Sequence, residues 1–202
     1  MNRNIFINCP FDEQYQELFD ALLFAVYFCG CKPRCALEID NGAQIRLEKI
    51  FTIIKDCDLG VHDISRTQLT PNNLPRFNMP LEFGIFLGAK KFGSTKQRQK
   101  SCMIFDSERY RYMEFMSDIS GQDIKWHSND YNEIIRKTRN WLNTFTTLQP
   151  LPGAAAIINK YNNYLLDKPS ILKSLNLIND DVQYADKTQI IEEWIKINPM
   201  QK

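Results

Sequence analysis

The sequence predicts an α/β fold in which a parallel sheet of about five strands carries helices on both faces and is followed by a small helical extension. Three observations lead to this prediction. Short apolar runs alternate with segments of helical periodicity, the runs end in polar residues, and the punctuated segment Gln149–Gly153 precedes a helical remainder. We therefore expect a sheet domain over residues 1–148 and a helical C-terminal extension over residues 149–202.

The first part of the chain predicts the order strand, helix, strand, helix. A mostly apolar run over Asn4–Asn8 indicates a strand, and the helix after it is closed by Gly30. Cys31–Glu38 indicates a second short strand, and the turn at Asp40–Gly42 leads into a second helix. The apolar positions at helical spacing are Tyr15, Leu18, Phe19, Leu22 and Val26 in the first helix, and Leu47, Ile50, Phe51 and Ile54 in the second.

The third strand is expected over Asp58–Ser65. It leads into a polar loop, Arg66–Met79, and long loops often carry function. Pro80 suits the first turn of a helix that runs to about Lys91. Leu81, Gly84, Ile85 and Gly88 share one side of this helix, and the two glycines predict close packing of that side against the sheet.

The remaining segments continue the same alternation. We expect a flexible connection at Gly93–Lys100, a strand at Ser101–Asp106, a helix at Glu108–Ile119, a short strand at Gln122–His127 and a helix at Tyr131–Phe145. In the extension, Ile157–Leu166 and Thr188–Ile197 have helical patterns. Ile190, Ile191 and Trp194 form an apolar face there, which we expect to be buried against the main domain or a second subunit.

The charge balance excludes some classes of partner. The chain has 25 Lys and Arg against 24 Asp and Glu, a formal net charge of +1, so it has no overall field that would attract nucleic acid or an anionic membrane. The longest apolar stretch, Leu18–Cys29, is interrupted by Asp20 and is shorter than the ~20 residues that span a bilayer. We therefore expect no nucleic-acid partner and no membrane span.

Cysteine usage points to a reducing compartment. Most of the six cysteines lie in apolar stretches, and the opening MNRNIFINCP lacks the pattern of a secretion signal, so we expect a cytoplasmic protein. Cys29, Cys31 and Cys35 are closely spaced, but no second half of a zinc motif follows them. No metal site is therefore expected.

Candidate site residues follow the strands. Ligands of open α/β sheets bind outside the carboxyl ends of the strands. The polar residues expected there are Asn8 and Asp12 after the first strand, Arg34 and Glu38 after the second, and Asp63, Ser65 and Arg66 after the third, with Asn78 at the start of the next helix. These groups are expected to converge on one crevice.

Glu82 is the strongest candidate for chemistry. It is expected in the first turn of a helix, where the helix dipole and free N–H groups favour an ionised carboxylate. Such a carboxylate suits attack on, or stabilisation of, a developing sugar cation. The alternative is an acidic residue that merely begins a helix.

The other candidates each have a structural alternative. Asp12 and Asp63 suit ribose hydroxyls, Ser65 suits ribose binding, and Arg46 and Arg66 suit phosphate. The two aspartates are equally explained as turn residues, and Arg46 as part of a solvated helix face.

Three further residues favour structural roles. His62 is expected to be a hydrogen-bonded core histidine rather than a general acid or base, and Cys9 a packing residue rather than a nucleophile. For Glu38, an ion pair with Arg34 or Arg46 is the preferred interpretation.

The segment that carries Glu82 also has a family resemblance. The stretch Asn78–Ala89, NMPLEFGIFLGA, resembles the glutamate-x-glycine helix of nucleoside 2-deoxyribosyltransferase-like proteins, and the order of elements is similar to a TIR domain. Over Phe6 to about Trp141, including Phe6–Asp12 and His62–Thr67, the chain also resembles small bacterial TIR-like proteins. The resemblance implies a flavodoxin-like sheet and places Glu82 as the glutamate that acts on an N-glycosidic bond.

The resemblance also implies a substrate class. TIR-like proteins cleave NAD or build signalling nucleotides from it, often in bacterial defence against phage, and often complete their sites between subunits. We therefore expect cleavage or transfer of the N-glycosidic bond of NAD or a related nucleotide by a homo-oligomer, with NAD as substrate and no cofactor. A free nucleoside is an alternative substrate, because Cys9–Asp12 replaces the serine-rich first loop of TIR domains. The alternative function is a non-catalytic module that senses a nucleotide or acts as a scaffold through oligomerisation.

Overall fold

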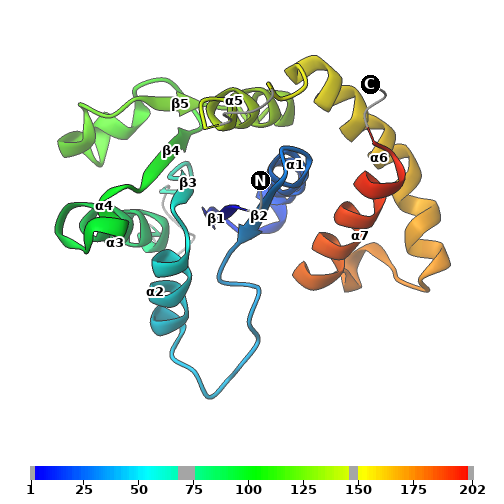
Figure 1. The fold of residues 1–202 in the computed structure, drawn as a ribbon, viewed down its shortest axis with the longest axis horizontal. Coiled ribbons are helices and arrows are strands. Elements are labelled where there is room, and N and C mark those ends of the chain that lie inside the picture. The colour runs from blue at the N-terminus through cyan, green and yellow to red at the C-terminus, as the bar shows by residue number, and fades with distance from the viewer. Residues whose placement is uncertain (1–2, 68–75, 146–149, 200–202) are drawn as a thin grey trace.

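The sheet has the predicted parallel architecture. The structure is a computed structural model that describes residues 3–67, 76–145 and 150–199. All strands of its sheet are parallel, in the order β2–β1–β3–β4–β5 (Figure 1). The strands are β1 (Arg3–Asn8), β2 (Cys31–Arg34), β3 (Leu59–Asp63), β4 (Ser101–Asp106) and β5 (Ile124–Trp126). The strand order reverses between β1 and β3, as in flavodoxin-like proteins, so the predicted fold is confirmed.

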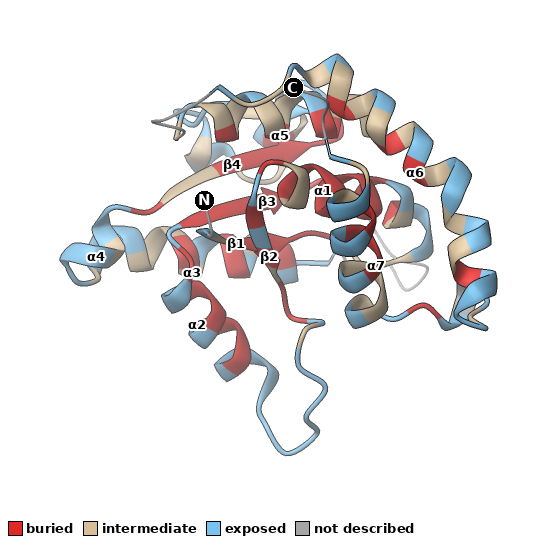
Figure 2. Cartoon of the chain, turned by 45° about the vertical axis from the view of Figure 1, so that its right-hand side comes forward, coloured by how far each residue is buried: buried red, intermediate tan, exposed pale blue. Residues whose placement is uncertain are grey.

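Helices cover both faces of the sheet. Ile5 and Ile7 of β1 point to one side, where α1 (Gln16–Phe28) and α5 (Tyr131–Asn143) pack. Phe6 points to the other side and packs with α2 (Arg46–Asp56) and α3 (Asn78–Phe92). This alternation along one strand explains why the strands read as continuous apolar runs. Figure 2 shows β3 and most of β1 and β4 as buried, at the centre of the molecule.

The C-terminal extension is a helical hairpin on the outside of α1. It consists of α6 (Ala154–Ser174) and α7 (Tyr184–Ile197) (Figure 1). The ring of Phe24 in α1 lies 5.1 Å from Tyr161 of α6 and 5.8 Å from Trp194 of α7, measured between centroids. The predicted burial of the Trp194 face is therefore confirmed, and the main domain is what covers it.

Some expected elements differ in extent. The strand predicted over Cys31–Glu38 ends at Arg34. The chain then turns, and the side chain of Arg34 forms an ion pair with Glu38, with 2.5 Å between Nη2 and Oε1. The helix predicted over Glu108–Ile119 is replaced by two 3-10 turns, η2 (Arg111–Glu114) and η3 (Ser117–Ile119). The left-handed conformation of Tyr110, with φ of 65°, prevents a continuous helix there. The remaining short turns are η1 (Glu13–Tyr15) and η4 (Asn179–Asp181).

The connection predicted to be flexible contains a short helix, α4 (Thr95–Arg98), and ends at a fully buried lysine. Lys100 Nζ donates to the carbonyl of Ile54 at 2.6 Å and also to that of Cys57. Both carbonyls lie at the carboxyl end of α2, where a cation is favoured. Lys100 therefore fixes the carboxyl end of α2 against the sheet.

The face of α3 that contacts the sheet differs from the predicted one. Leu81 is 55% exposed and Gly84 is also exposed, and a Cβ atom at Gly84 or Gly88 would meet nothing within 4 Å. The buried positions are Met79, Glu82, Phe83 and Phe86, at helical spacing. The close approach occurs instead at Gly60 of β3, where a Cβ would lie 2.9 Å from the Phe86 ring. The prediction that Gly84 and Gly88 pack against the sheet is therefore wrong, and Glu82 shares the buried face of α3.

Within the described residues, no helix combines the length and the apolar character needed to cross a bilayer.

Candidate functional site

The predicted site residues gather where the strand order reverses. Asn8 and Asp63 are the last residues of β1 and β3. Cys9 directly follows Asn8, and its pKa is raised well above its ordinary value, first by burial and then by the charges of Asp63, Glu82 and Asp12, among others. Three predicted carboxylates are therefore close enough to act on one thiol. The same effect keeps Cys9 protonated, which agrees with a packing role rather than a nucleophilic one.

Asn8 connects the end of β1 to α3. Its side chain is 2% exposed, and its Nδ2 donates to the carbonyl of Met79 at 2.8 Å and contacts Nδ1 of His62 at 3.1 Å. Both amide protons are thereby used inside the protein. In this structure Asn8 positions the first turn of α3, whereas the sequence predicted a ligand contact.

His62 is a core histidine, as predicted. Because Asn8 donates to Nδ1, the ring proton is assigned to Nε2, which has no hydrogen-bond partner among the described residues. The ring is surrounded by Phe6, Phe83 and Phe86, with centroids 4.8 to 5.6 Å away. Burial, and to a smaller degree the charge of Lys100, lowers the pKa of His62 to about 3, so the ring is neutral at physiological pH.

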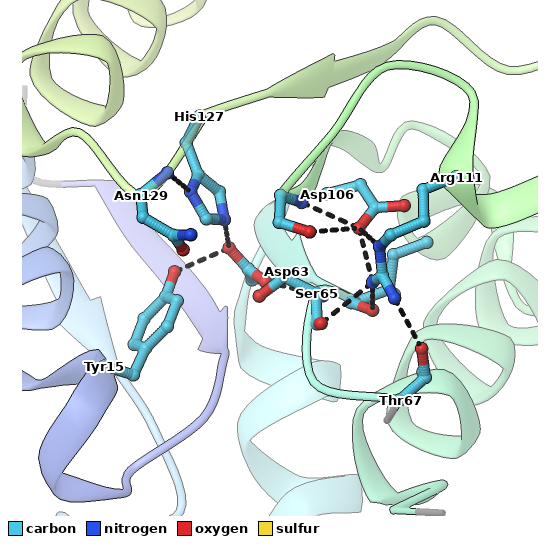
Figure 3. A network of polar contacts seen from close by, with 10 residues as sticks. Tyr15, Asp63, Ser65, Thr67, Asp106, Arg111, His127 and Asn129 are labelled. Carbon is cyan, nitrogen blue, oxygen red and sulfur yellow. Dashed lines mark hydrogen bonds and ion pairs between the residues drawn. The ribbon is translucent and has the colours of Figure 1, made fainter. Parts of the chain in front are cut away.

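Asp63 is the anionic centre of a buried network (Figure 3). Its carboxylate accepts from Tyr15 Oη at 2.6 Å and from the backbone N–H of Ser65 at 2.8 Å. His127 Nε2 lies 3.2 Å from Asp63 Oδ2, which meets the distance of an ion pair but not the angle of a good hydrogen bond. Nδ1 of His127 accepts from the N–H of Asn129 at 3.0 Å, so Nε2 carries the proton that faces Asp63.

This network keeps Asp63 ionised. Burial alone would raise the pKa of Asp63, but the contact with His127 and the hydrogen bonds of Ser65 and Tyr15 hold it below its ordinary value. The two oxygens of Asp63 are occupied by protein groups. A ribose hydroxyl would therefore have to share or replace one of these contacts.

Arg111 links the carboxyl ends of the neighbouring strands β3 and β4 (Figure 3). Its guanidinium donates to Asp106 Oδ1 at 2.5 and 2.8 Å, to the carbonyls of Ile64 and Ser65 at 3.1 and 2.8 Å, and to Thr67 Oγ1 at 3.2 Å. One side chain thus joins the ends of β3 and β4. Burial raises the pKa of Asp106, although Arg111 opposes that effect, and Asp106 Oδ2 is buried with no hydrogen-bond partner in the described part of the chain.

Asp12 and Arg66 pair with one another. Arg66 Nη2 lies 3.1 Å from Asp12 Oδ1, and Arg76 Nη1 lies 3.6 Å from Asp12 Oδ2. The sequence predicted a ribose ligand and a phosphate ligand at Asp12 and Arg66. Both side chains are only partly exposed, and each is the other's partner in this structure.

Glu82 lies near the end of β1, since its charge acts on Cys9, but it does not have the predicted environment. Because α3 begins at Asn78, Glu82 falls one turn inside the helix, and it is 8% exposed. Burial raises its pKa to about 7, while the charge of Arg46 opposes this. The prediction that Glu82 is fully ionised at neutral pH is therefore wrong. A carboxyl group with this pKa is present in both the acid and the base form at pH 7.

The remaining predicted residues lie at the rim. Arg46 is the first residue of α2 and is exposed, and Asn78 is the first residue of α3 and is also exposed. Neither has a hydrogen bond or an ion pair within residues 3–67, 76–145 and 150–199. Part of the predicted loop Arg66–Met79, residues 68–75, lies outside the described residues.

Four residues of these networks, Tyr15, Asp106, Arg111 and His127, were not predicted as site residues. A signal is present for two of them, because Asp106 and His127 end the fourth and fifth predicted strands. Tyr15 falls on an apolar helix face, and nothing in the sequence links it to a carboxylate 48 positions away. No group of three or more His, Cys, Asp and Glu side chains is arranged to hold a metal ion in the described residues.

No protein-family model matches this chain, and the curated proteins contain no match to it.

Proposed function

We propose that this protein binds a nucleoside or nucleotide, such as NAD, at the crevice and cleaves or transfers its N-glycosidic bond with Glu82. The role in antiphage defence or signalling that the family resemblance implies is part of the same proposal. NAD is a substrate here and not a cofactor.

The observation that carries the proposal is the unpartnered state of Glu82. Four carboxylates are buried in the described structure: Asp20, Asp63, Glu82 and Asp106. Asp20 is held by two lysines, Asp63 by Tyr15 and His127, and Asp106 by Arg111. Glu82 has no hydrogen bond or ion pair with any described residue. Glu82 is 8% exposed, and its oxygens are not among the fully enclosed polar atoms of the described residues that lack a partner, so the carboxyl group is mostly buried but can still be reached by a ligand. Carboxyl groups with a pKa raised by burial are concentrated at functional sites.

The chemistry follows from the two protonation states of Glu82. In its ionised form, a carboxylate oxygen stabilises or attacks C1′ of the ribose as the C1′–N bond breaks, and the base leaves with the bonding electrons. Nicotinamide leaves NAD as a neutral molecule because its ring was cationic, whereas the base of a nucleoside takes up a proton. Water or an acceptor nucleophile then attacks C1′ and releases the carboxylate. The positive charge develops on the sugar, so the negative form of Glu82 is the reactive one.

Substrate contacts are available at the rim. Arg46 has no described ion-pair partner and its charge reaches Glu82, so it suits a phosphate group next to the reacting sugar. Asp12 and Arg66 suit ribose and phosphate if the ion pair between them opens on binding. Asn8 and Ser65 have positioning roles, since Asn8 holds α3 in place and the backbone N–H of Ser65 orients Asp63.

The test is base release by purified protein. NAD, nucleosides and 2′-deoxynucleosides are incubated with wild type, Glu82→Gln and the matched control Glu192→Gln, and the free base is measured by chromatography. Glu192 lies on α7 and is half exposed, far along the chain from the crevice. We expect release by wild type and Glu192→Gln and a loss of at least 100-fold in Glu82→Gln. Equal release by Glu82→Gln and wild type would contradict the catalytic role.

A non-catalytic nucleotide sensor is the second candidate. The observation that favours it is that Asp12, Asp63 and Arg66 are already engaged with protein groups, which leaves few free groups to orient ribose for reaction. Binding of NAD in a calorimetric titration, without base release by assembled protein, would support the sensor. The self-association that the resemblance implies is measured in the same samples by light scattering.

A further inference from the structure

The C-terminal hairpin has a groove between its two helices. The helices run antiparallel, since Lys160 Nζ of α6 donates to the carbonyls of Asn198 and Pro199, just beyond α7, at 3.1 Å each. Further along, Trp194 Nε1 donates to Asp167 Oδ2 at 2.9 Å. The space between the helices measures about 640 Å³ and lies outside the crevice described above.

The lining of this groove is largely apolar. Its apolar residues are Ile171, Leu175, Leu177, Ile190, Trp194 and Ile197. Two of them face solvent to an unusual degree, since Ile197 is 77% exposed and Leu175 is 52% exposed. Apolar side chains gathered in one groove indicate a binding surface more strongly than the same residues scattered singly.

The charges of the groove have a single sign. Its charged lining residues are Asp167, Asp186 and Glu193, and none of the described lining residues is basic. Asp167 accepts a hydrogen bond from the indole of Trp194, and Asp186 accepts one from the backbone N–H of Gln183 at the start of α7, so neither carboxylate is paired with a cation in the described structure. Glu193 pairs with Lys196, but both side chains are more than half exposed, and such pairs are weak.

The lysines that flank the groove point elsewhere. Lys168 of α6 and Lys187 of α7 both reach Asp20 of α1, at 3.0 and 2.7 Å. These two ion pairs fasten the hairpin to the main domain. They also direct these two cations away from the groove, which leaves Lys196 and Lys160 as the lysines that contact its lining residues, at Glu193 and at the carbonyl of Asn198.

We infer that this groove is a docking site for an amphipathic helix of a partner protein whose apolar face is flanked by Lys or Arg. The part of α7 that lines the groove, Asp186 to Ile197, is about 16 Å long at 1.5 Å per residue, which matches about three turns of a bound helix. Apolar anchors in such a groove are the usual way in which a helix is recognised. A second copy of this chain is a poorer occupant, because two identical acidic rims would face each other.

The inference is tested with a defined peptide. A fluorescein-labelled 14-residue peptide of Leu and Lys in an amphipathic helical pattern is titrated with the full-length protein and followed by fluorescence anisotropy. We expect saturable binding, and at least tenfold weaker binding by Leu175→Glu, by Ile197→Glu and by Glu193→Lys. A peptide with Glu in place of every Lys is expected to bind at least tenfold more weakly than the Leu/Lys peptide.

Leu166→Glu is the matched control. Leu166 is on α6 and 79% exposed, but it does not line the groove, so its substitution should change the Kd less than twofold. Circular dichroism confirms that each variant is folded, and hydrogen exchange should show protection by the peptide along residues 167–198. Absence of binding, or equal weakening by Leu166→Glu and the groove variants, would overturn the inference. So would a dimer in light scattering that Leu175→Glu dissociates, since a second copy would then occupy the groove.

Discussion

Replacing Glu82 by glutamine is expected to stabilise the protein above neutral pH and to have little effect in acid. Burial raises the pKa of Glu82 from an ordinary value of 4.5 to about 7. The folded protein therefore holds this proton more tightly than the unfolded chain does. The stabilising effect of the protonated carboxyl is fully present below pH 4.5 and is lost as the pH rises through about 7.

The magnitude follows from the same two values. The difference between 4.5 and about 7 corresponds to about 3 kcal/mol, which is the free energy that ionised Glu82 removes from the folded state above pH 7. Glutamine has a similar shape and does not ionise, so it avoids this penalty. Glu82→Gln should accordingly be more stable than wild type by up to about 3 kcal/mol at pH 8 and nearly equal to it at pH 4.5.

The measurement is urea unfolding of both proteins at pH 4.5 and pH 8, followed by tryptophan fluorescence. Comparing the two proteins at each pH removes the contributions of other titrating groups. Glu192→Gln, at an exposed site, should show the same small difference from wild type at both pH values. If Glu82→Gln were no more stable than wild type at pH 8, the carboxyl would not be buried without a partner, and the proposed function would lose its main support.

Two other predictions concern the structure around the site. Gly60→Ala should destabilise the protein by about 1–3 kcal/mol, because the new Cβ would lie 2.9 Å from the packed ring of Phe86. Gly84→Ala should stabilise the protein by up to about 1 kcal/mol, because its Cβ is unobstructed and alanine favours a helix. Thermal unfolding of the two variants tests this, and a destabilised Gly84→Ala would mean that α3 faces the sheet differently. Arg111→Ala should lower the free energy of unfolding in urea by about 3–5 kcal/mol, because it leaves buried Asp106 without its cation. A decrease below about 1 kcal/mol would show that the contacts of Arg111 contribute little to stability.

The fold could be predicted because its signals are local and repeated. Alternating apolar runs and helical faces imply a parallel sheet with crossover helices, and a parallel sheet brings the carboxyl ends of its strands to one edge. For this reason the prediction that Asn8, Asp63 and Ser65 lie at one edge agrees with the structure. A sequence is less informative about which side of a helix faces inward when both sides carry apolar residues. In α3, Phe83 and Phe86 are buried, and the smaller residues Gly84 and Gly88 are left outside.

The chemical state of the site depends on distant contacts and is therefore harder to predict. Asp12 and Arg66 are 54 positions apart, as are Asn8 and His62, and only the folded structure shows that these groups use one another as partners. The start of α3 has a large effect on the prediction for Glu82. The sequence places Pro80 in the first turn of a helix that starts at Asn78, and the helix does begin at Asn78. Counted from Asn78, however, Glu82 is the fifth helical residue and lies just beyond the favourable first turn.

The position of Glu82 on α3 separates a structural from a functional explanation. Met79, Phe83 and Phe86 are its neighbours on the buried face, so a purely structural requirement at position 82 would be met by an apolar residue or by glutamine, either of which removes the cost of ionisation. A larger distance between α3 and the strand ends would also remove that cost, because Glu82 would then face solvent. Instead, Asn8 holds the first turn of α3 against β1, and Gly60 lets Phe86 approach β3. The surrounding residues thus keep an unpaired carboxyl close to the crevice. That arrangement is expected of a group that reacts with a ligand, because the partner that would stabilise the carboxylate arrives only with the developing positive charge of the substrate.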